Sequence, residues 1–101
     1  GGDPEDLLKI SGDKIISIQL NGVSKDPWED IVEETISARL LPDEGENDVI
    51  GFVKNLDQIK SKAPIGIEIF SKELYKLPKE EIGRITGNSL SKIVKKARED
   101  R

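Results

Sequence analysis

The sequence predicts an α/β fold with a parallel sheet, and three observations support that class. Two short runs rich in β-branched residues, 14–20 (KIISIQL) and 65–70 (IGIEIF), are typical of strands. The stretches between and after them carry apolar residues at helical spacing, and strands that alternate with helices form βα units. Fourteen of the 101 residues are isoleucine, which suits strands packed under helices.

The first half of the chain is expected to run from a helix into a strand and then into a second helix. Asp3 is a good N-cap for the first helix, and Pro4 fits its first helical position. The strand at 14–20 follows. The second helix is expected at 28–38, where one apolar stripe contains Trp28, Ile31, Val32, Thr35 and Ile36.

The second half is expected to contain a helix, a strand and a long final helix. After a loop at 40–47, Asp48 caps a helix that reaches Lys60, with a face made of Val49, Phe52, Val53, Leu56 and Ile59. The strand at 65–70 follows. Pro78 opens the final helix, and Gly87-Asn88 predicts a kink or a break into two helices.

Two strands cannot form a stable sheet that helices cover on both faces. The chain therefore looks like an arc of a larger structure, and we treat residues 1–101 as one piece of a single domain.

The composition excludes several kinds of function. Without cysteine or histidine, the chain has no disulfide, no thiolate nucleophile, no cysteine–zinc site and no imidazole base. Any chemistry must rest on carboxylates, amides, lysines and arginines. No apolar run approaches the ~20 residues that a membrane span needs, so we predict a soluble, cytoplasmic protein without a membrane partner.

The net charge of −4 hides an uneven distribution along the chain. Residues 26–48 carry nine acids against Arg39 alone, whereas 72–101 carry nine cations against five acids. The basic segment is interpreted as a solvated helix face, because acids are interleaved with its cations and only Tyr75 offers a ring for stacking. Nucleic-acid binding is therefore not expected.

The two predicted strands each have one aliphatic face and one polar face. Strand side chains alternate, so Ile16, Ile18 and Leu20 share a face in the first strand, as do Ile65, Ile67 and Ile69 in the second. The opposite faces carry Gln19 and Glu68 near the carboxyl ends of the strands, where a parallel α/β barrel places its chemistry.

Glu68 and Gln19 are therefore the candidate site residues. A carboxylate between Ile67 and Ile69 is costly to bury unless it binds a cation or is hydrogen-bonded. The alternatives for Glu68 are an exposed edge position or a salt bridge to a nearby lysine. For Gln19 the alternative is an amide that satisfies a neighbouring polar group.

Several quoted segments carry a family resemblance that covers nearly the whole chain. They are GGDPEDLL at 1–8, KIISIQLNG at 14–22, ETISARLLPDEGENDVIGFVKNL at 34–56 and PIGIEIFSKEL at 64–74. Together they resemble the C-terminal part of sugar phosphate isomerases/epimerases of the xylose isomerase-like TIM-barrel superfamily. The most specific segment, RLLPDEGE at 39–46, is similar to the family loop R-x-L-P-G-E-G-E.

The resemblance implies a fold and a set of site residues. The fold is a C-terminal arc, about two to three βα units, of a (β/α)8 TIM barrel, whose full length is ~250 residues. Glu68 falls on a glutamate that binds metal in this superfamily, and Gln19 falls where many members have a metal-binding histidine. Arg39 and Glu46 fall on loop positions that border the substrate pocket, with a salt bridge that pins the loop as the alternative.

The chain also departs from the family pattern. Gly22 stands where many members have an aspartate, and Asp43 replaces the first glycine of the P-G-E-G-E loop. The family's Asp-x-x-His motif, which precedes the segment that GGDPE matches, does not occur in the sequence.

Three functional hypotheses follow from the resemblance. The first is the C-terminal part of a metal-dependent sugar (phosphate) isomerase or epimerase that transfers a proton next to a carbonyl. In it Glu68 holds a divalent ion (Mn, Mg, Zn or Co), Gln19 holds the substrate or a metal-bound water, and the substrate is a small sugar or polyol. The second is a non-catalytic binding module derived from the barrel, and the third is a metal-dependent lyase such as an inosose dehydratase. The isolated chain is not expected to be active, and its expected partner is the N-terminal part of the barrel or another chain that completes the sheet.

Overall fold

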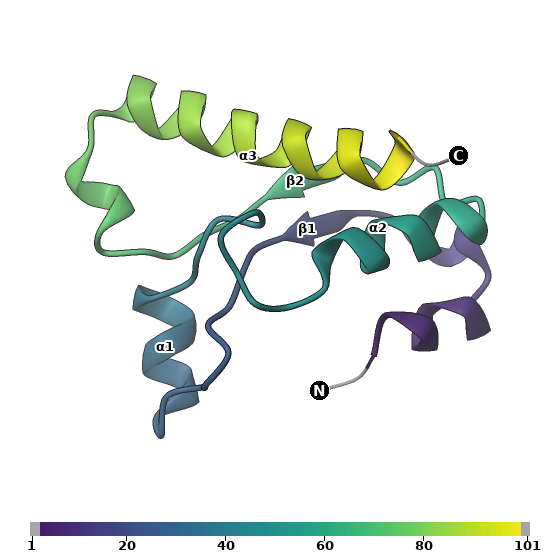
Figure 1. Cartoon of the computed structure of the whole chain (residues 1–101), viewed down its shortest axis with the longest axis horizontal. Coiled ribbons are helices and arrows are strands. Elements are labelled where there is room, and N and C mark those ends of the chain that lie inside the picture. The colour runs from purple at the N-terminus through teal and green to yellow at the C-terminus, as the bar shows by residue number, and fades with distance from the viewer. Residues whose placement is uncertain (1–2, 100–101) are drawn as a thin grey trace.

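A computed structural model describes residues 3–99 and gives the chain an α/β architecture (Figure 1). Two strands, β1 (Ile18–Leu20) and β2 (Ile65–Ile67), alternate with the helices α1 (Ile31–Ser37), α2 (Val49–Gln58) and α3 (Lys79–Glu99). Three short 3-10 helices complete the order: η1 (Pro4–Lys9), η2 (Gly12–Lys14) and η3 (Leu74–Lys76). Of the proposed domain 1–101, residues 1–2 and 100–101 lie outside the described part.

The two strands are adjacent and parallel, as the fold class predicts. Ile18 pairs with Ile65, Gln19 with Gly66 and Leu20 with Ile67. Directly paired residues of a parallel sheet point to the same side, so the isoleucines and Leu20 share one face while Gln19 and Gly66 share the other. The predicted separation into an aliphatic and a polar face is confirmed over these six residues.

Both strands are shorter than the predicted ranges 14–20 and 65–70. Residues 12–14 form η2 instead, and the ladder begins where the Ile18 N–H donates to Pro64 O at 3.0 Å. At the other end, the Arg39 N–H donates to Phe70 O at 3.1 Å, so the chain after β2 pairs with the segment that leaves α1. A ladder extends only as far as both partners stay in register, which here is three residues.

Ile16 does not lie on the buried face, contrary to the prediction. It is 87% exposed, whereas Ile15 packs against the core. Strict alternation starts only at Ile18, where the ladder with β2 begins, and residues 15–17 lie between η2 and β1 outside that ladder. The prediction was wrong because it extended the strand period into residues that β2 does not pair with.

The core lies between one face of the sheet and the helices α2 and α3, which run across it (Figure 1). Val53 of α2 is completely buried, and Asp48 caps this helix by accepting the Gly51 N–H at 2.9 Å. The predicted apolar face of α2 is therefore confirmed. The buried cluster contains Ile18, Leu20, Val49, Val53, Leu56, Ile93 and Ala97.

The final helix is continuous, so the predicted break at Gly87-Asn88 is wrong. α3 runs for 21 residues, and both Gly87 and Asn88 are exposed on it. A glycine inside a helix costs about 1 kcal/mol relative to alanine. Burial of Ile93 and Ala97 further along the same helix outweighs that cost.

The cations of α3 form a solvated face, as interpreted from the sequence. Arg98 pairs with Asp57 at 3.1 Å and Lys92 with Asp43 at 3.5 Å, so acids of neighbouring segments meet them. Among residues 3–99, no helix has the length and apolar character that a membrane crossing requires.

Candidate functional site at the carboxyl end of the sheet

Gln19 and Glu68 lie on the same side of the sheet, near the carboxyl ends of the two strands. Gln19 pairs with Gly66, and Glu68 follows Gly66 by two residues, so strand alternation returns its side chain to that side. Both residues are exposed, while Ile69 on the opposite side is buried. The Asn21 amide, just after β1, donates to Glu68 O at 3.4 Å and ties the two strand ends together.

The Glu68 carboxylate has neither a hydrogen bond nor an ion pair within residues 3–99. Of the two alternatives for Glu68, the lysine salt bridge is therefore not formed in this part of the chain, and the exposed position is what the structure has. An exposed carboxylate beside a strand end is accessible to a cation from the open side of the sheet.

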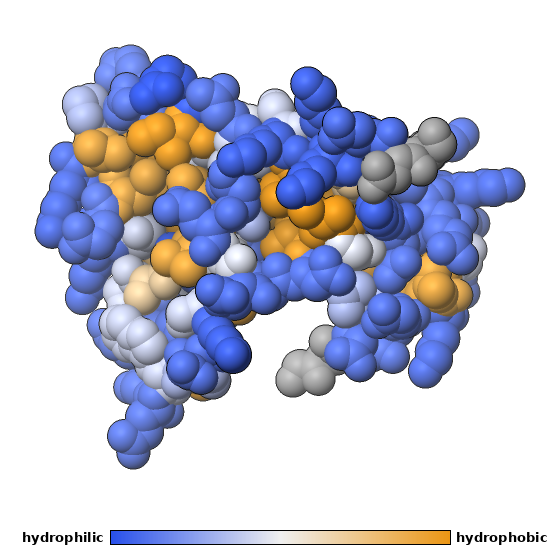
Figure 2. Space-filling view, in the orientation of Figure 1, coloured by the Kyte–Doolittle hydropathy of each residue, from blue (hydrophilic) through white to orange (hydrophobic). Residues whose placement is uncertain are grey.

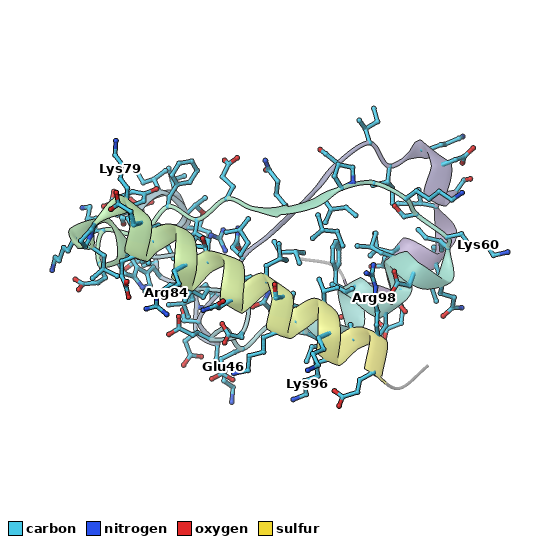
Figure 3. All side chains as sticks on the ribbon, turned by 90° about the horizontal axis from the view of Figure 1, so that it is seen from above. Glu46, Lys60, Lys79, Arg84, Lys96 and Arg98 are labelled. Carbon is cyan, nitrogen blue, oxygen red and sulfur yellow. The ribbon has the colours of Figure 1, made fainter. Side chains whose placement is uncertain are left out.

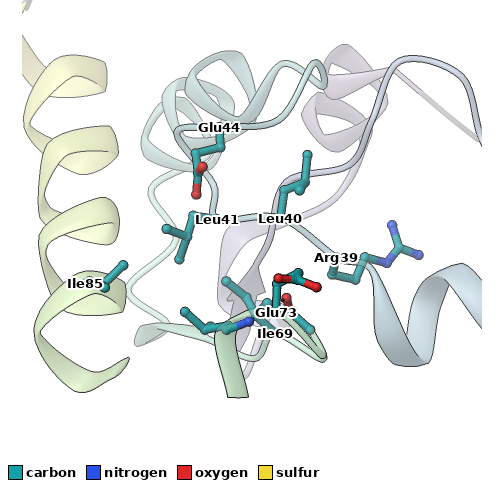
Figure 4. Close-up of a pocket in the computed structure, with 9 residues that line it drawn as sticks. Arg39, Leu40, Leu41, Glu44, Ile69, Glu73 and Ile85 are labelled. Carbon is teal, nitrogen blue, oxygen red and sulfur yellow. Dashed lines mark hydrogen bonds between the residues drawn. The ribbon is translucent and has the colours of Figure 1, made fainter. Parts of the chain in front are cut away.

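Arg39 is half-buried at the same edge, but its guanidinium points away from the strands. Its Nη2 donates to Thr35 Oγ1 of α1 at 2.9 Å, and Figure 4 shows the side chain directed toward that helix. Glu46 is exposed, and its side chain stands at the surface (Figure 3), while its backbone N–H donates to Val23 O at 2.8 Å. The alternative of an Arg39–Glu46 salt bridge is not seen among the described residues.

The loop that carries these residues is fastened by contacts that the sequence analysis did not identify. Asn47 bridges it to the end of β1, since its Oδ1 accepts the Val23 N–H at 2.9 Å and its Nδ2 donates to Asn21 O at 3.3 Å. Gly22 and Gly45 meet backbone to backbone: a Cβ on Gly22 would lie 2.9 Å from the Gly45 Cα and 2.3 Å from Leu41 O. An aspartate at position 22, as in many family members, would not fit this packing.

Asp43, the second departure from the family pattern, anchors the loop to α3. Ser89, buried at 4% exposure, donates its hydroxyl to the Asp43 carboxylate and accepts the Asp43 N–H at 3.3 Å. Lys92 lies 3.5 Å from the same carboxylate. The Ser89 hydrogen bond, with a smaller contribution from Lys92, lowers the pKa of Asp43 although partial burial opposes it.

A cavity of about 510 Å³ lies on the other side of the sheet from Glu68, between the loop, η3 and α3 (Figure 4). Its walls include Leu40, Leu41, Ile69, which lies on the helix side of the sheet, and Ile85 of α3, with Glu44 and Glu73 at its margin. A smaller hollow of about 260 Å³ borders Gln19, Asn21 and Asn47. The larger cavity therefore belongs to the helix side and adjoins the candidate residue Arg39, whereas the smaller one adjoins Gln19.

Two residues, Glu68 and Gln19, could donate ligands to a metal ion, but they do not form a complete site. A carboxylate and an amide oxygen are ligands that hard divalent cations accept. Within residues 3–99, no group of three or more carboxylates is placed to enclose an ion. Glu68 and Gln19 therefore fit the chemistry of a divalent ion as one side of a site, and further donors would have to come from elsewhere.

The geometry so far defines a class: a parallel βα arc with polar groups at the carboxyl ends of its strands. Over 96% of the chain, this structure superposes on a crystal structure of the IolI protein with a bound zinc atom, at a TM-score of 0.84 and 26% sequence identity. It superposes with the same coverage and TM-score, at 27% identity, on a xylose isomerase-like TIM barrel/4-hydroxyphenylpyruvate dioxygenase fusion protein. No protein-family model and no curated protein sequence matches the chain.

The chain thus has the structure of one part of a xylose isomerase-like TIM barrel, which confirms the predicted fold class. It spans 34% of the IolI chain and 15% of the fusion protein.

Proposed function

We propose that this chain supplies the last βα units of a barrel that isomerises or epimerises a small sugar, polyol or sugar phosphate. The observation that carries the proposal is the placement of Gln19 and Glu68 at the carboxyl ends of adjacent parallel strands, on the side that a closed barrel turns inward. The likeness to xylose isomerase-like barrels supports the reaction class, which is proton transfer next to a carbonyl.

Glu68 would bind a divalent metal ion through its free carboxylate. The bound zinc atom of the IolI structure supports a metal in this kind of barrel. When bound, such an ion polarises the oxygens of the substrate and so acidifies the neighbouring C–H bond. Gln19, which faces the same side one strand away, would hold a substrate oxygen through its amide and thereby fix the orientation of the sugar.

Arg39 and Glu46 remain proposed substrate contacts. Arg39 leaves α1 at the carboxyl edge of the sheet, and its guanidinium would have to exchange Thr35 for the substrate. The acceptor in that hydrogen bond is the neutral hydroxyl oxygen of Thr35. An anionic group of the substrate would form a stronger, charge-assisted bond with the Arg39 guanidinium and would therefore displace it.

The rest of the barrel is the proposed partner. In the described structure β1 and β2 pair only with each other, so each presents one unpaired edge. Parallel strands from an N-terminal part of the barrel, or from another chain, would satisfy both edges and enclose the polar face.

The test is Glu68→Gln in the assembled barrel, because this change keeps the side-chain shape and removes the charge. Exchange of substrate C–H protons with D₂O, followed by NMR over a panel of sugars and sugar phosphates, reports proton transfer whatever the direction of the reaction. We expect metal-dependent exchange to fall by at least about 100-fold and metal affinity, measured by calorimetry, to fall with it.

Glu73→Gln is the matched control, since Glu73 is exposed and, among residues 3–99, its carboxylate pairs with Lys76 at 3.0 Å. It should leave both readouts unchanged. Full exchange activity in Glu68→Gln would refute the metal role of Glu68. Metal binding without exchange of any substrate would instead favour the barrel-derived binding module.

A further inference from the structure

Asn21 and Gly22 form an Asn-Gly pair, the sequence in which an asparagine side chain deamidates most readily. The reaction requires the backbone nitrogen of the next residue to reach the side-chain carbonyl carbon, and glycine has no Cβ to obstruct that approach. No other Asn-Gly pair occurs in the 101 residues. The pair directly follows β1, where Asn21 is half-buried and Gly22 is buried.

Deamidation here would proceed in two steps, with water as the co-reactant. First, the deprotonated Gly22 N forms a bond to Asn21 Cγ and the Cγ–Nδ2 bond breaks. The proton that Gly22 N gives up ends on the departing nitrogen, which leaves as ammonia, and a cyclic imide remains. Water then opens the imide at either carbonyl and yields aspartate or isoaspartate, in which the main chain passes through the former side chain.

The folded chain keeps both reacting groups in hydrogen bonds. The Gly22 N–H donates to Leu40 O at 2.7 Å, and the Leu40 N–H donates back to Gly22 O at 2.9 Å. Loss of the Gly22 proton would break the first bond and leave Leu40 O without its donor, which disfavours the nucleophile. The leaving nitrogen, Asn21 Nδ2, donates to Glu68 O at 3.4 Å.

The loop at 40–47 closes over the pair. Asn47 fastens it, because its Oδ1 accepts the Val23 N–H at 2.9 Å and its Nδ2 donates to Asn21 O at 3.3 Å. Gly45 packs so closely that a Cβ on it would lie 2.6 Å from the Gly22 Cα. Formation of the imide turns the peptide unit between Asn21 and Gly22, so the loop has to move away first.

The loop can open while the helices stay packed. It leads into α2, where Val49 and Val53 belong to the buried core, and Figure 2 shows apolar surface between α2 and α3. The loop itself exposes Asp43, Glu44, Glu46 and Asn47 and is held mainly by polar contacts. Segments with few buried apolar contacts open at a lower free energy than the core does.

We propose that Asn21 is a deamidation site that the loop at 40–47 protects, so that the modification takes place in chains whose loop has opened. Isoaspartate adds one carbon, or about 1.5 Å, to the main chain before Gly22, which can then no longer keep both bonds to Leu40. Either product also replaces the amide donor to Glu68 O by a carboxylate, which only accepts hydrogen bonds. The modification therefore releases the loop and the tie between the strand ends in one direction only.

Mass spectrometry of the peptide that contains Asn21 tests the proposal. The 101-residue chain is incubated at neutral pH, folded or unfolded in urea, and electron-based fragmentation separates aspartate from isoaspartate. We expect the folded chain to react at least about tenfold more slowly, because a protected site reacts in proportion to the population of its open form. Far-UV circular dichroism confirms which samples are folded.

Variants of the loop test whether it is the protecting element. Asn47→Ala removes both hydrogen bonds of that side chain and should raise the folded-state rate at least about fivefold. Ser89→Ala removes the anchor of the same loop on α3 and should raise the rate as well. Asn88→Ala is the matched control, because it makes the same change as Asn47→Ala at an exposed position of α3, and it should leave the rate unchanged.

Four results would overturn the inference. The first is an equal rate in the folded and unfolded chains, and the second is an Asn47→Ala rate no higher than that of Asn88→Ala. The third is a folded-state rate that rises steeply with urea well below the unfolding transition, since global unfolding would then expose the pair. The fourth is a purified isoaspartate chain in which the Gly22 amide exchanges with D₂O no faster than in the unmodified chain.

Discussion

At the scale of single residues, the two positions at which the sequence departs from the family pattern make the contacts that hold the loop at 40–47. The Asp43 carboxylate accepts a hydrogen bond from the hydroxyl of buried Ser89, and Gly22 has no side chain, so that Gly45 can pack against it. The two departures therefore fasten one loop at two points, to α3 and to the end of β1. Because this loop leads from Arg39 to Glu46, its rigidity decides where both residues stand.

The Asp43 contact predicts a specific dependence of stability on pH. The folded state lowers the pKa of Asp43, so the stabilisation is present above the carboxyl's ordinary pKa of about 4 and is lost as pH falls through the lower folded value. Asp43→Asn should cost about 1 kcal/mol of unfolding free energy at pH 7 and less at about pH 3, where part of the stabilisation has been lost. Urea unfolding at the two pH values measures both quantities.

Glu44→Gln is the control for this experiment, because Glu44 is the adjacent exposed acid. Its effect on stability should be small and similar at both pH values. An Asp43→Asn penalty that persists unchanged at low pH would mean that Ser89 bonds the amide equally well, and that charge plays no part.

Gln19 gives a second prediction at the residue scale. In the assembled barrel, Gln19→Ala should raise KM or lower kcat by the equivalent of about 1–3 kcal/mol, the cost of leaving a polar partner unpaired. Steady-state kinetics measures the two constants separately. An unchanged rate would return Gln19 to its structural alternative and leave Glu68 as the remaining candidate.

At the scale of elements, α2 ends in a way that its sequence does not favour. Lys60 has a φ of 60°, the left-handed region, and it occupies the position where helices most often have glycine. The hydrogen bonds there are those of a Schellman motif, because the Ser61 N–H donates to Leu56 O and the Lys60 N–H to Asp57 O, both at 3.0 Å. The motif forms despite the lysine because Leu56 on the same turn is buried.

This end of α2 therefore carries removable strain. Lys60→Gly should stabilise the chain by about 0.5–1 kcal/mol, since glycine avoids the left-handed penalty but loses more entropy on folding. The midpoint of urea unfolding should rise without a change in slope. Lys62→Gly, two residues later and at a negative φ, should lower the midpoint instead, and a parallel gain there would contradict the explanation.

At the scale of the whole molecule, the dominant feature is a sheet with two unpaired edges and an uncovered polar face. Three paired residues per strand leave few backbone bonds to resist opening. The chain alone should therefore unfold with low cooperativity, and amides of β1 and β2 should exchange with D₂O faster than those of α2. Addition of the remainder of a barrel should protect the strand amides, and a highly cooperative 11.2 kDa monomer would contradict this expectation.

The sequence alone determined the order of elements, the parallel pairing and the buried side of α2. These depend on local periodicity and on the cap at Asp48, and local patterns are readable without a fold. It also identified Gln19 and Glu68 as a pair on one side of the sheet, because alternation in a strand depends on residue number alone.

Only the tertiary structure decided the rest. Ile16 and the stripe on α1 are apolar by sequence yet exposed, because the direction that a face takes depends on what lies beside it, and the described chain offers them no neighbour. Contacts with other residues also decide two further features. α3 continues across Gly87 because residues further along the helix are buried, and Arg39 points toward α1 because it donates a hydrogen bond to Thr35. Periodicity says which residues share a face, but packing between distant segments decides which face is buried.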